Sequence, residues 1–294
     1  MRSSQAQGGL KLHYQSSIAT CALALCSLPA WTQSGGVATI SAGPGTVVRW
    51  RGADTTRCSM KGRSWAALQG TCYYPVDLLQ AAGTRISISR SSAGRTHLGH
   101  ITVEAVDYGT EDITLPDIPQ ANPSAADLRR DALDRAKLGK IFTRQEGMAR
   151  FTLPLSPPAK PLPPAKSFGV KRIFNGKPAA QPHTGVDYAT PLGSPVLAVA
   201  DGVVVMAEDM FFEGNAVFIN HGVGLISMYF HLSDIKVAVG EQVKKGHVLG
   251  RVGSTGRATG PHLFFGIRWH DARIDPRFVL EEPRKIPDVE DPSS

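Results

Sequence analysis

The sequence predicts a mainly β protein made of two β-rich domains, with one helix and a proline-rich segment between them. Short runs of β-branched residues, separated by clusters of Gly, Ser and Asp, fill residues 37–120 and again residues 167–280. Residues 121–166 carry one helical pattern and then many prolines. The length of 294 residues suits about two domains, each large enough to bury its own core.

The first domain, residues 37–120, is expected to be all β and closed by a disulfide. Its β-like runs are VATIS, TVVRW, TRISISR and HITVEAV. Once an export signal is removed, Cys58 and Cys72 are the cysteines that remain, and an even pair separated by a short loop in an exported chain most often forms a disulfide. The alternative is two unpaired buried thiols, which an oxidising compartment disfavours.

The segment between the domains begins with a helix. Ser124 is a suitable N-cap, and Asp127 follows three residues later, so the sequence predicts a helix over about 124–138. The run LPLSPPAKPLPPAKS (153–167) then contains six prolines, which cannot continue a helix. It forms either an extended polyproline spacer or an irregular strap packed on a domain surface.

The amino-terminal residues predict export. Arg2 and Lys11 precede the apolar run SIATCALALCSLPAW (17–31), which is short for a membrane span and resembles a secretory signal. We expect residues 1–30 to be a signal peptide cut near Ala30, with an uncleaved anchor as the alternative. The protein is therefore expected in the periplasm or cell envelope, touching the membrane only through an uncleaved amino-terminal segment.

Charge gives a weaker indication of the partner. The formal net charge of +7 favours an anionic partner such as nucleic acid, acidic lipid or an anionic cell wall. No stretch interleaves Arg and Lys with aromatics at a nucleic-acid-binding spacing, so nucleic acid is not expected. The acidic, proline-containing end EEPRKIPDVEDPSS (281–294) predicts a disordered tail.

Four side chains in the second domain are suited to metal or proton chemistry. His183 and Asp187 lie in PHTGVDYAT, and a histidine with a carboxylate suits zinc, which takes nitrogen and oxygen ligands. His231 ends the apolar run MYFHLS, and His262 lies in GPHLFFGI. Taken singly, each histidine is more often a structural residue than a ligand.

Taken in order, the motifs of this domain resemble those of the lysostaphin-type (LytM-type) zinc peptidases, which cut peptide bridges in peptidoglycan. The resemblance covers about residues 168–278. It implies a compact antiparallel β-sandwich, a Zn²⁺ cofactor, and peptide crosslinks of the cell wall as the partner. The motifs are FGVKRIFNGKPAAQPHTGVDYATPLGSPVLAVADGVV, GLISMYFHLS, VAVGEQVKKGHVLGRVGSTG and ATGPHLFFGI.

The resemblance also implies roles for single residues. His183 and Asp187 correspond to zinc ligands, and His231 and His262 to the catalytic histidines that activate the zinc-bound water and stabilise the oxyanion. The family's third ligand is a histidine two residues after His262. Here that position is Phe264.

Phe264 divides the functional prediction in two. Catalytic zinc is held by three protein ligands, and a phenyl ring has no lone pair to donate, so zinc binding is expected to be weak. The chain is then either a zinc endopeptidase of reduced activity, or an inactive relative that binds wall peptide or regulates another cell-wall hydrolase. Other histidines of the domain have no spacing that places them at the metal: His221, His247 and His270.

Two further readings remain from the sequence. The walls of the groove are expected from the loop after Asp209 and from the loop around Arg257, with Phe211 and Phe212 acting as packing residues or as rim contacts. PVLAVADGVV and VKKGHVLGRVGSTG also resemble lipoyl and biotinyl carrier domains, but the modifiable lysine motif of those carriers does not occur between them.

Overall fold

The computed structural model describes residues 36–143, 147–165, 167–280 and 283–291, and most of them lie in strands. The predicted mainly β fold class is confirmed. The predicted signal peptide lies outside the described residues. Among those residues, no helix is both long and apolar enough to cross a membrane.

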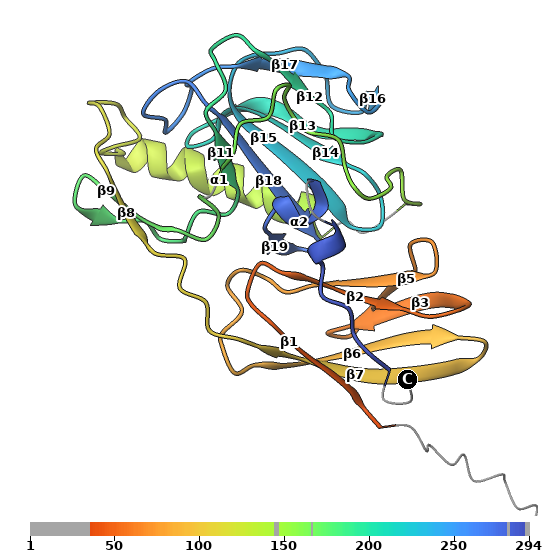
Figure 1. The fold of residues 1–294 in the computed structure, drawn as a ribbon. Coiled ribbons are helices and arrows are strands. Elements are labelled where there is room, and N and C mark those ends of the chain that lie inside the picture. Colours follow the sequence, from red (N-terminus) through yellow and green to blue (C-terminus); the bar gives the residue numbers. More distant parts are fainter. Residues whose placement is uncertain (1–35, 144–146, 166, 281–282, 292–294) are drawn as a thin grey trace, which may run out of the picture. The chain divides into compact units, whose positions relative to one another are not determined.

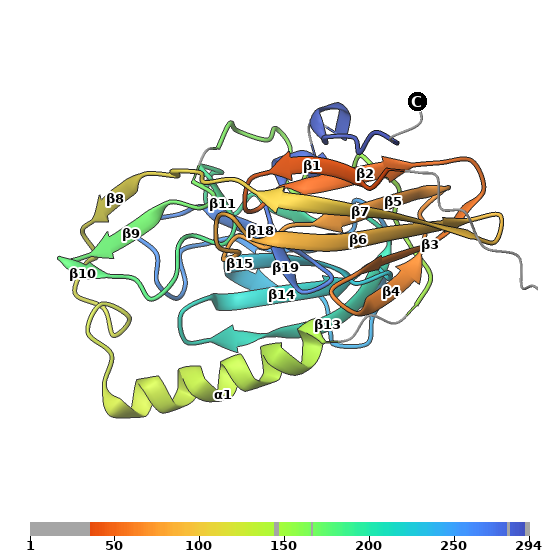
Figure 2. The same ribbon diagram turned by 90° about the horizontal axis from the view of Figure 1, so that it is seen from below.

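The amino-terminal β region has two small sheets (Figures 1 and 2). One has the strand order β1-β7-β6-β3-β4, and the other pairs β2 with β5. Alternating buried residues from these strands form a common core that includes Trp50, Tyr74 and Ile101. The strands are β1 (Ala38–Ala42), β2 (Val47–Arg51), β3 (Thr55–Met60), β4 (Arg63–Ala66), β5 (Thr71–Pro75), β6 (Arg85–Ser92) and β7 (Arg95–Val103).

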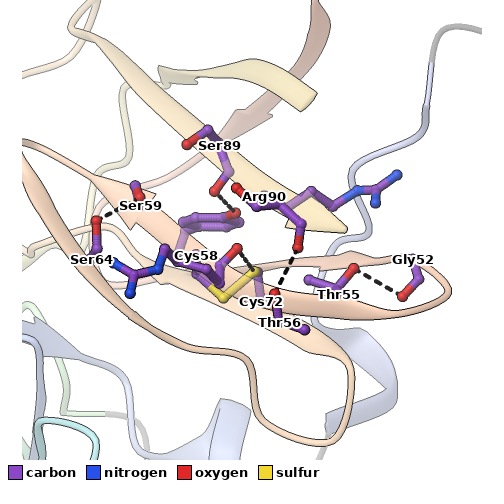
Figure 3. The surroundings of a disulfide bond; sticks show 12 residues. Gly52, Thr55, Thr56, Cys58, Ser59, Ser64, Cys72, Ser89 and Arg90 are labelled. Atoms are coloured by element: carbon purple, nitrogen blue, oxygen red, sulfur yellow. Dashed lines mark hydrogen bonds between the residues drawn. A yellow bond between two sulfur atoms is a disulfide. The ribbon is translucent and has the colours of Figure 1, made fainter. Parts of the chain in front are cut away.

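Cys58 and Cys72 join the two small sheets. Cys58 lies on β3 of one sheet and Cys72 on β5 of the other, and their sulfur atoms form a disulfide of 2.07 Å (Figure 3). Both cysteines are fully buried in the core. The Tyr74 hydroxyl donates a hydrogen bond of 2.7 Å to the Ser89 carbonyl beside them. The disulfide therefore adds a covalent link to contacts that the apolar core already makes.

The carboxyl-terminal segment differs from the prediction. Residues 281–294 were expected to be disordered, but 283–291 are ordered against the amino-terminal β region. Asp288 forms an ion pair of 2.6 Å with Arg49, and the amide of Val289 bonds the carbonyl of Arg49. The Val289 side chain is buried in the same core as Trp50. The segment is ordered because its apolar and acidic residues find complementary partners far away in the sequence.

The second β region is built on a nine-stranded sheet in which all neighbouring strands are antiparallel. Its main path runs β11-β18-β15-β14-β13-β16. A separate small sheet has the order β10-β9-β8. The elements are β8 (Thr110–Ile113), β9 (Lys171–Phe174), β10 (Lys177–Pro178), β11 (Val186–Tyr188), β12 (Pro195–Leu197), β13 (Gly202–Met210), β14 (Gly214–Asn220), β15 (Leu225–Ile235), β16 (Gln242–Val243), β17 (Val248–Val252), β18 (Leu263–Trp269), β19 (Ala272–Ile274), α2 (Arg277–Leu280) and η1 (Pro283–Lys285).

Helix α1 (Ala125–Phe142) packs along one face of this sheet, near β13 and β14 in Figure 2. Ser124 caps it, and Asp127 completes a capping box, as the sequence predicted. The helix continues past the predicted end near residue 138, because Ile141 and Phe142 bury their side chains against the sheet.

The proline-rich segment forms an irregular strap packed on the second β region and not an extended spacer. Leu155 and Ala159 are buried in the main core of the second β region. The amide of Leu155 donates to the carbonyl of Val279, and the amide of Ser156 donates to that of Val199. Prolines suit this place, because they leave few backbone N–H groups that need a partner.

Replacing Cys58 and Cys72 together with serine tests the contribution of the disulfide. The two residues are 14 apart in sequence. Opening a loop of this length is expected to lower the free energy of unfolding by about 3 kcal/mol. Urea unfolding of the double variant, beside the wild type with and without reductant, measures the change. An unchanged unfolding midpoint would show that the apolar core alone stabilises this region.

Candidate functional site

Three strands place Asp187, Phe264 and Phe230 side by side. Asp187 on β11 pairs directly with Phe264 on β18, and Phe264 pairs directly with Phe230 on β15. Directly paired residues project to the same face of a sheet, so the three side chains form one row. The rings of Phe264 and Phe230 stack with centroids 4.4 Å apart and an interplanar angle of 3°.

A β-bulge turns His231 toward the same row. On β14, Asn215 and Val217 are two residues apart, but their partners on β15, Leu232 and Tyr229, are three apart. The extra residue lies at His231, whose φ of 63° is in the left-handed region. Without the bulge, His231 and its neighbour in sequence would face opposite sides of the sheet. With it, the His231 ring lies 4.7 Å from the ring of His262.

The Asp187 carboxylate is surrounded by two imidazoles and a guanidinium. His183 Nε2 lies 3.2 Å from Asp187 Oδ1, and His262 Nε2 lies 3.7 Å from the same oxygen. Arg172 on β9 donates to Asp187 Oδ2 at 2.6 Å. The structure therefore brings together His183, Asp187 and His262, and adds Arg172, to which the sequence analysis gave no role.

Each of the three histidines is oriented by its other ring nitrogen. The Nδ1 atoms contact backbone carbonyl oxygens, which only accept hydrogen bonds, so every Nδ1 is a donor. The Nε2 atoms are consequently left for the site. The contacts join His183 to Ser167, His231 to Thr255 and His262 to Gly260, at 3.0, 2.8 and 2.9 Å.

Burial and charge set the ionisation of this cluster. Burial, together with the nearby His262, lowers the pKa of His231 to about 3, so this imidazole is neutral at neutral pH. Burial alone would raise the pKa of Asp187, but contact with His183 and the charge of Arg172 outweigh it and hold that pKa well below its ordinary value. Asp187 is therefore a stable carboxylate.

Phe230 and Phe264 of this row line a cleft of about 780 Å³, together with His183 and His231. Helix α1 forms one wall with Leu138 and Phe142, and β9 contributes Arg172 and Phe174. The loops around Phe212 and Arg257 line it as well, as the sequence analysis expected of those loops. The position of α1 as a wall of the cleft was not predicted, because the sequence of the helix does not indicate which face of a distant sheet the helix covers.

Comparisons with known proteins agree with this arrangement. The family model described as peptidase family M23 matches residues 181–276. Those residues form a domain of peptidase family M23. The predicted resemblance to the lysostaphin-type zinc peptidases is confirmed.

Relatives of the M23 domain are named as endopeptidases. The chain is 42% identical over 101 residues to the peptidoglycan DD-endopeptidase ShyA of Vibrio cholerae, covering 34% of this chain and 24% of that protein. It is 48% identical over 94 residues to the DD-carboxypeptidase/endopeptidase Mpg of Neisseria meningitidis, covering 32% of this chain and 22% of that protein. The chain thus aligns with about a quarter of the length of these curated relatives.

A solved structure covers more of the chain. A protein from Pseudomonas aeruginosa, described as a candidate M23 peptidase, is 29% identical with a TM-score of 0.61, covering 81% of this chain and 93% of that one. The similarity therefore extends beyond the M23 domain into the regions that precede it.

The M23 family is zinc-dependent, but the residues at this site do not fit a three-ligand zinc ion. Phe264, at the position where the resemblance predicts the third ligand, is buried, packed on Phe230 and edge-on to His183 at 5.2 Å. Arg172 already neutralises one oxygen of Asp187. Among the described residues, no group of three or more His, Cys, Asp or Glu side chains is arranged to hold a metal ion.

None of the other histidines of the domain replaces the missing ligand. His221 is buried and contacts the Asp201 carbonyl at 2.7 Å and the Ser227 hydroxyl at 2.8 Å. The His270 ring packs on Trp65, and the exposed His247 lies 3.8 Å from the nearest acidic side chain. Within the described part of the chain, the cleft is lined by none of the three.

Stability is predicted to fall in mild acid because of His221. Burial lowers its pKa from 6.5 to about 4, so the unfolded chain takes up a proton that the folded chain excludes in this interval. The contribution of His221 to the free energy of unfolding is therefore fully present above pH 6.5. It decreases as the pH falls toward 4, by roughly 3 kcal/mol in all. Urea unfolding of the wild type at several pH values measures the decrease.

His221→Gln separates this residue from the other acid-sensitive groups. The variant is expected to be less stable at neutral pH, because two buried hydrogen bonds change, but to show a shallower decrease in acid. His247→Gln, at an exposed position, is the matched control and should follow the wild type. Parallel curves for the wild type and His221→Gln would contradict the assignment.

Proposed function

We propose that this chain is a peptidoglycan-binding protein of the cell envelope whose M23 domain does not cut peptides by zinc catalysis. The observation that carries the proposal is the stack of Phe264 on Phe230, at the position predicted for the third ligand. Such a protein holds wall peptide in the cleft, either for anchoring or to regulate another cell-wall hydrolase.

The contacts of the site support the proposal that it does not hold catalytic zinc. Catalytic zinc requires three protein ligands and an open position for water, and Phe264 supplies no donor atom. Moving its ring aside would break the stack with Phe230 and open a void in the apolar cluster that includes Phe142 of α1. In addition, the Arg172 guanidinium and a dication beside the same carboxylate would repel each other.

The partner and the location are inferred from the relatives and the charge. The Vibrio cholerae relative is named as a peptidoglycan endopeptidase, and the formal net charge of +7 suits an anionic wall. The predicted export signal in residues 1–30 agrees with a place in the periplasm or cell envelope.

A second candidate function is a zinc endopeptidase of peptide crosslinks. The contact of His183 Nε2 with Asp187 Oδ1 at 3.2 Å supports it, because two lone pairs this close need a shared proton or a cation between them. Asp187 Oδ1 is buried and accepts no hydrogen bond from the described residues. In this case His183 and Asp187 are the zinc ligands, and His231 and His262 handle protons.

Zinc content distinguishes the two candidates. The purified wild type, dialysed against micromolar zinc, is expected to hold much less than one ion per chain and to leave purified peptidoglycan undigested. Phe264→His is expected to raise the zinc content, because it restores the third donor. Phe264→Leu, which is apolar and has no donor, is the matched control. Stoichiometric zinc with digestion by the wild type would overturn the proposal.

Binding is the second measurement. The wild type is expected to sediment with purified peptidoglycan sacculi, with or without a chelator, because the cleft does not need metal. Phe142→Ala, which removes an apolar wall contact of the cleft, is expected to weaken sedimentation several-fold. No sedimentation of the wild type in either condition would contradict a binding function.

A further inference from the structure

Arg257 lines the cleft and, among the described residues, has no carboxylate in an ion pair with it. Its guanidinium carbon lies 4.3 Å from the ring centroid of Phe174 and 4.5 Å from that of Phe212, so the guanidinium is held between two rings. It makes no hydrogen bond or ion pair with any side chain or carbonyl in the described parts of the chain. Arg257 is therefore fixed in position with its donors available.

The other arginines that line the cleft are paired. Each has a carboxylate partner within the fold, so none has its full fork of donors available to a ligand. The pairs are Arg135 with Asp131, Arg172 with Asp187, Arg268 with Asp271 and Arg273 with Asp77, at 2.7, 2.6, 2.6 and 3.0 Å. Arg257 differs from all four.

The loop that carries Arg257 is rigid. The amide of Arg257 donates to the Phe212 carbonyl at 2.8 Å, and the amide of Asn215 donates to the Thr255 hydroxyl at 3.0 Å. At Gly256, whose φ is 69°, an added Cβ would lie 2.4 Å from the amide nitrogen of Gly214, so the two loops cross in direct backbone contact. The same loop accepts the Nδ1 hydrogen bond of the site histidine on β15.

The electrostatic surroundings leave Arg257 charged. Burial lowers its pKa, with Glu213 opposing that shift, but a guanidinium stays protonated at any physiological pH. Among the acidic groups, Glu213 acts most strongly on Arg257, and burial, with the charges of Asp131 and Asp134, raises the pKa of Glu213. A half-buried cation with no carboxylate partner among the described residues attracts an anion.

We propose that Arg257 binds a carboxylate group of the peptide held in the cleft. The proposal rests on the peptide-binding function above and adds the chemical class of the ligand, a peptide with a free carboxylate. The planar guanidinium between Phe174 and Phe212 presents two parallel N–H donors, which match the two oxygens of a carboxylate. The apolar row at Phe264 and Phe230 then receives the uncharged part of the ligand.

Calorimetric titration with two synthetic peptides tests the proposal. One is a peptidoglycan stem peptide with its carboxylates free, and the other is the same peptide with every carboxylate converted to an amide. The wild type is expected to bind the acid form at least tenfold more tightly, because a charge-assisted hydrogen bond is worth about one to two factors of ten in affinity. This comparison needs no variant, so it does not depend on the folding of one.

Variants assign the preference to Arg257. Arg257→Ala is expected to weaken binding of the acid form by about tenfold to hundredfold and to leave the amide form nearly unchanged. Arg257→Lys, which keeps the charge without the fork, is expected to lie between. The matched control is Arg251→Ala, which removes an exposed arginine outside the cleft lining and should bind like the wild type.

Each failure has a distinct meaning. If the wild type binds both peptides equally, or if Arg257→Ala keeps the wild-type preference for the acid, the carboxylate assignment is wrong and the peptide-binding function stands. If the wild type binds neither peptide, the peptide-binding function is wrong, and the role of Arg257 is overturned with it.

Discussion

Phe264 lies between Asp187 and Phe230 across three hydrogen-bonded strands, and its ring stacks on Phe230 at 4.4 Å. An aromatic pair of this geometry contributes about 0.5–1.5 kcal/mol beyond its buried area. The stack also continues into the apolar cluster where Phe142 of α1 packs, so the position of the helix and the shape of the cleft depend on the same ring. A histidine here would carry a polar ring nitrogen into that cluster. The phenyl ring thus serves packing at the position where the resemblance predicts a metal ligand.

The side chains around Phe264 are those that the resemblance predicts for the site. The β-bulge at His231 and the hydrogen bonds from Nδ1 to carbonyls still aim the imidazoles at Asp187. Arg172 brings a fixed positive charge to Asp187, the carboxylate that the resemblance predicts as a zinc ligand. The cleft therefore has polar side chains and walls but no third donor for a metal ion. This combination suits the proposed peptide-binding role.

The sequence predicted the members of the site better than their contacts. His183, Asp187, His231 and His262 could be grouped because the order of their motifs is specific, and the structure brings them together. Arg172 could have been predicted as a residue of the site by the same reasoning. Arg172 and Phe174 are two residues apart on one strand and so share a face, where Arg172 contacts Asp187 and Phe174 contacts Arg257. The stack of Phe230 on Phe264 could not be predicted, because it depends on the register of two strands whose paired residues are more than thirty positions apart in sequence. The ordered carboxyl-terminal segment was missed for a similar reason: its partners, such as Arg49, are distant in sequence and its composition alone indicates disorder.

A crystal structure of the full chain grown with millimolar zinc, with anomalous diffraction recorded on both sides of the zinc absorption edge, tests the central claim most directly. The account predicts no anomalous peak between His183 and Asp187, with Arg172 still paired to the carboxylate and Phe264 still stacked on Phe230. A fully occupied zinc ion on His183 and Asp187, with a third protein or water ligand in place, would contradict it.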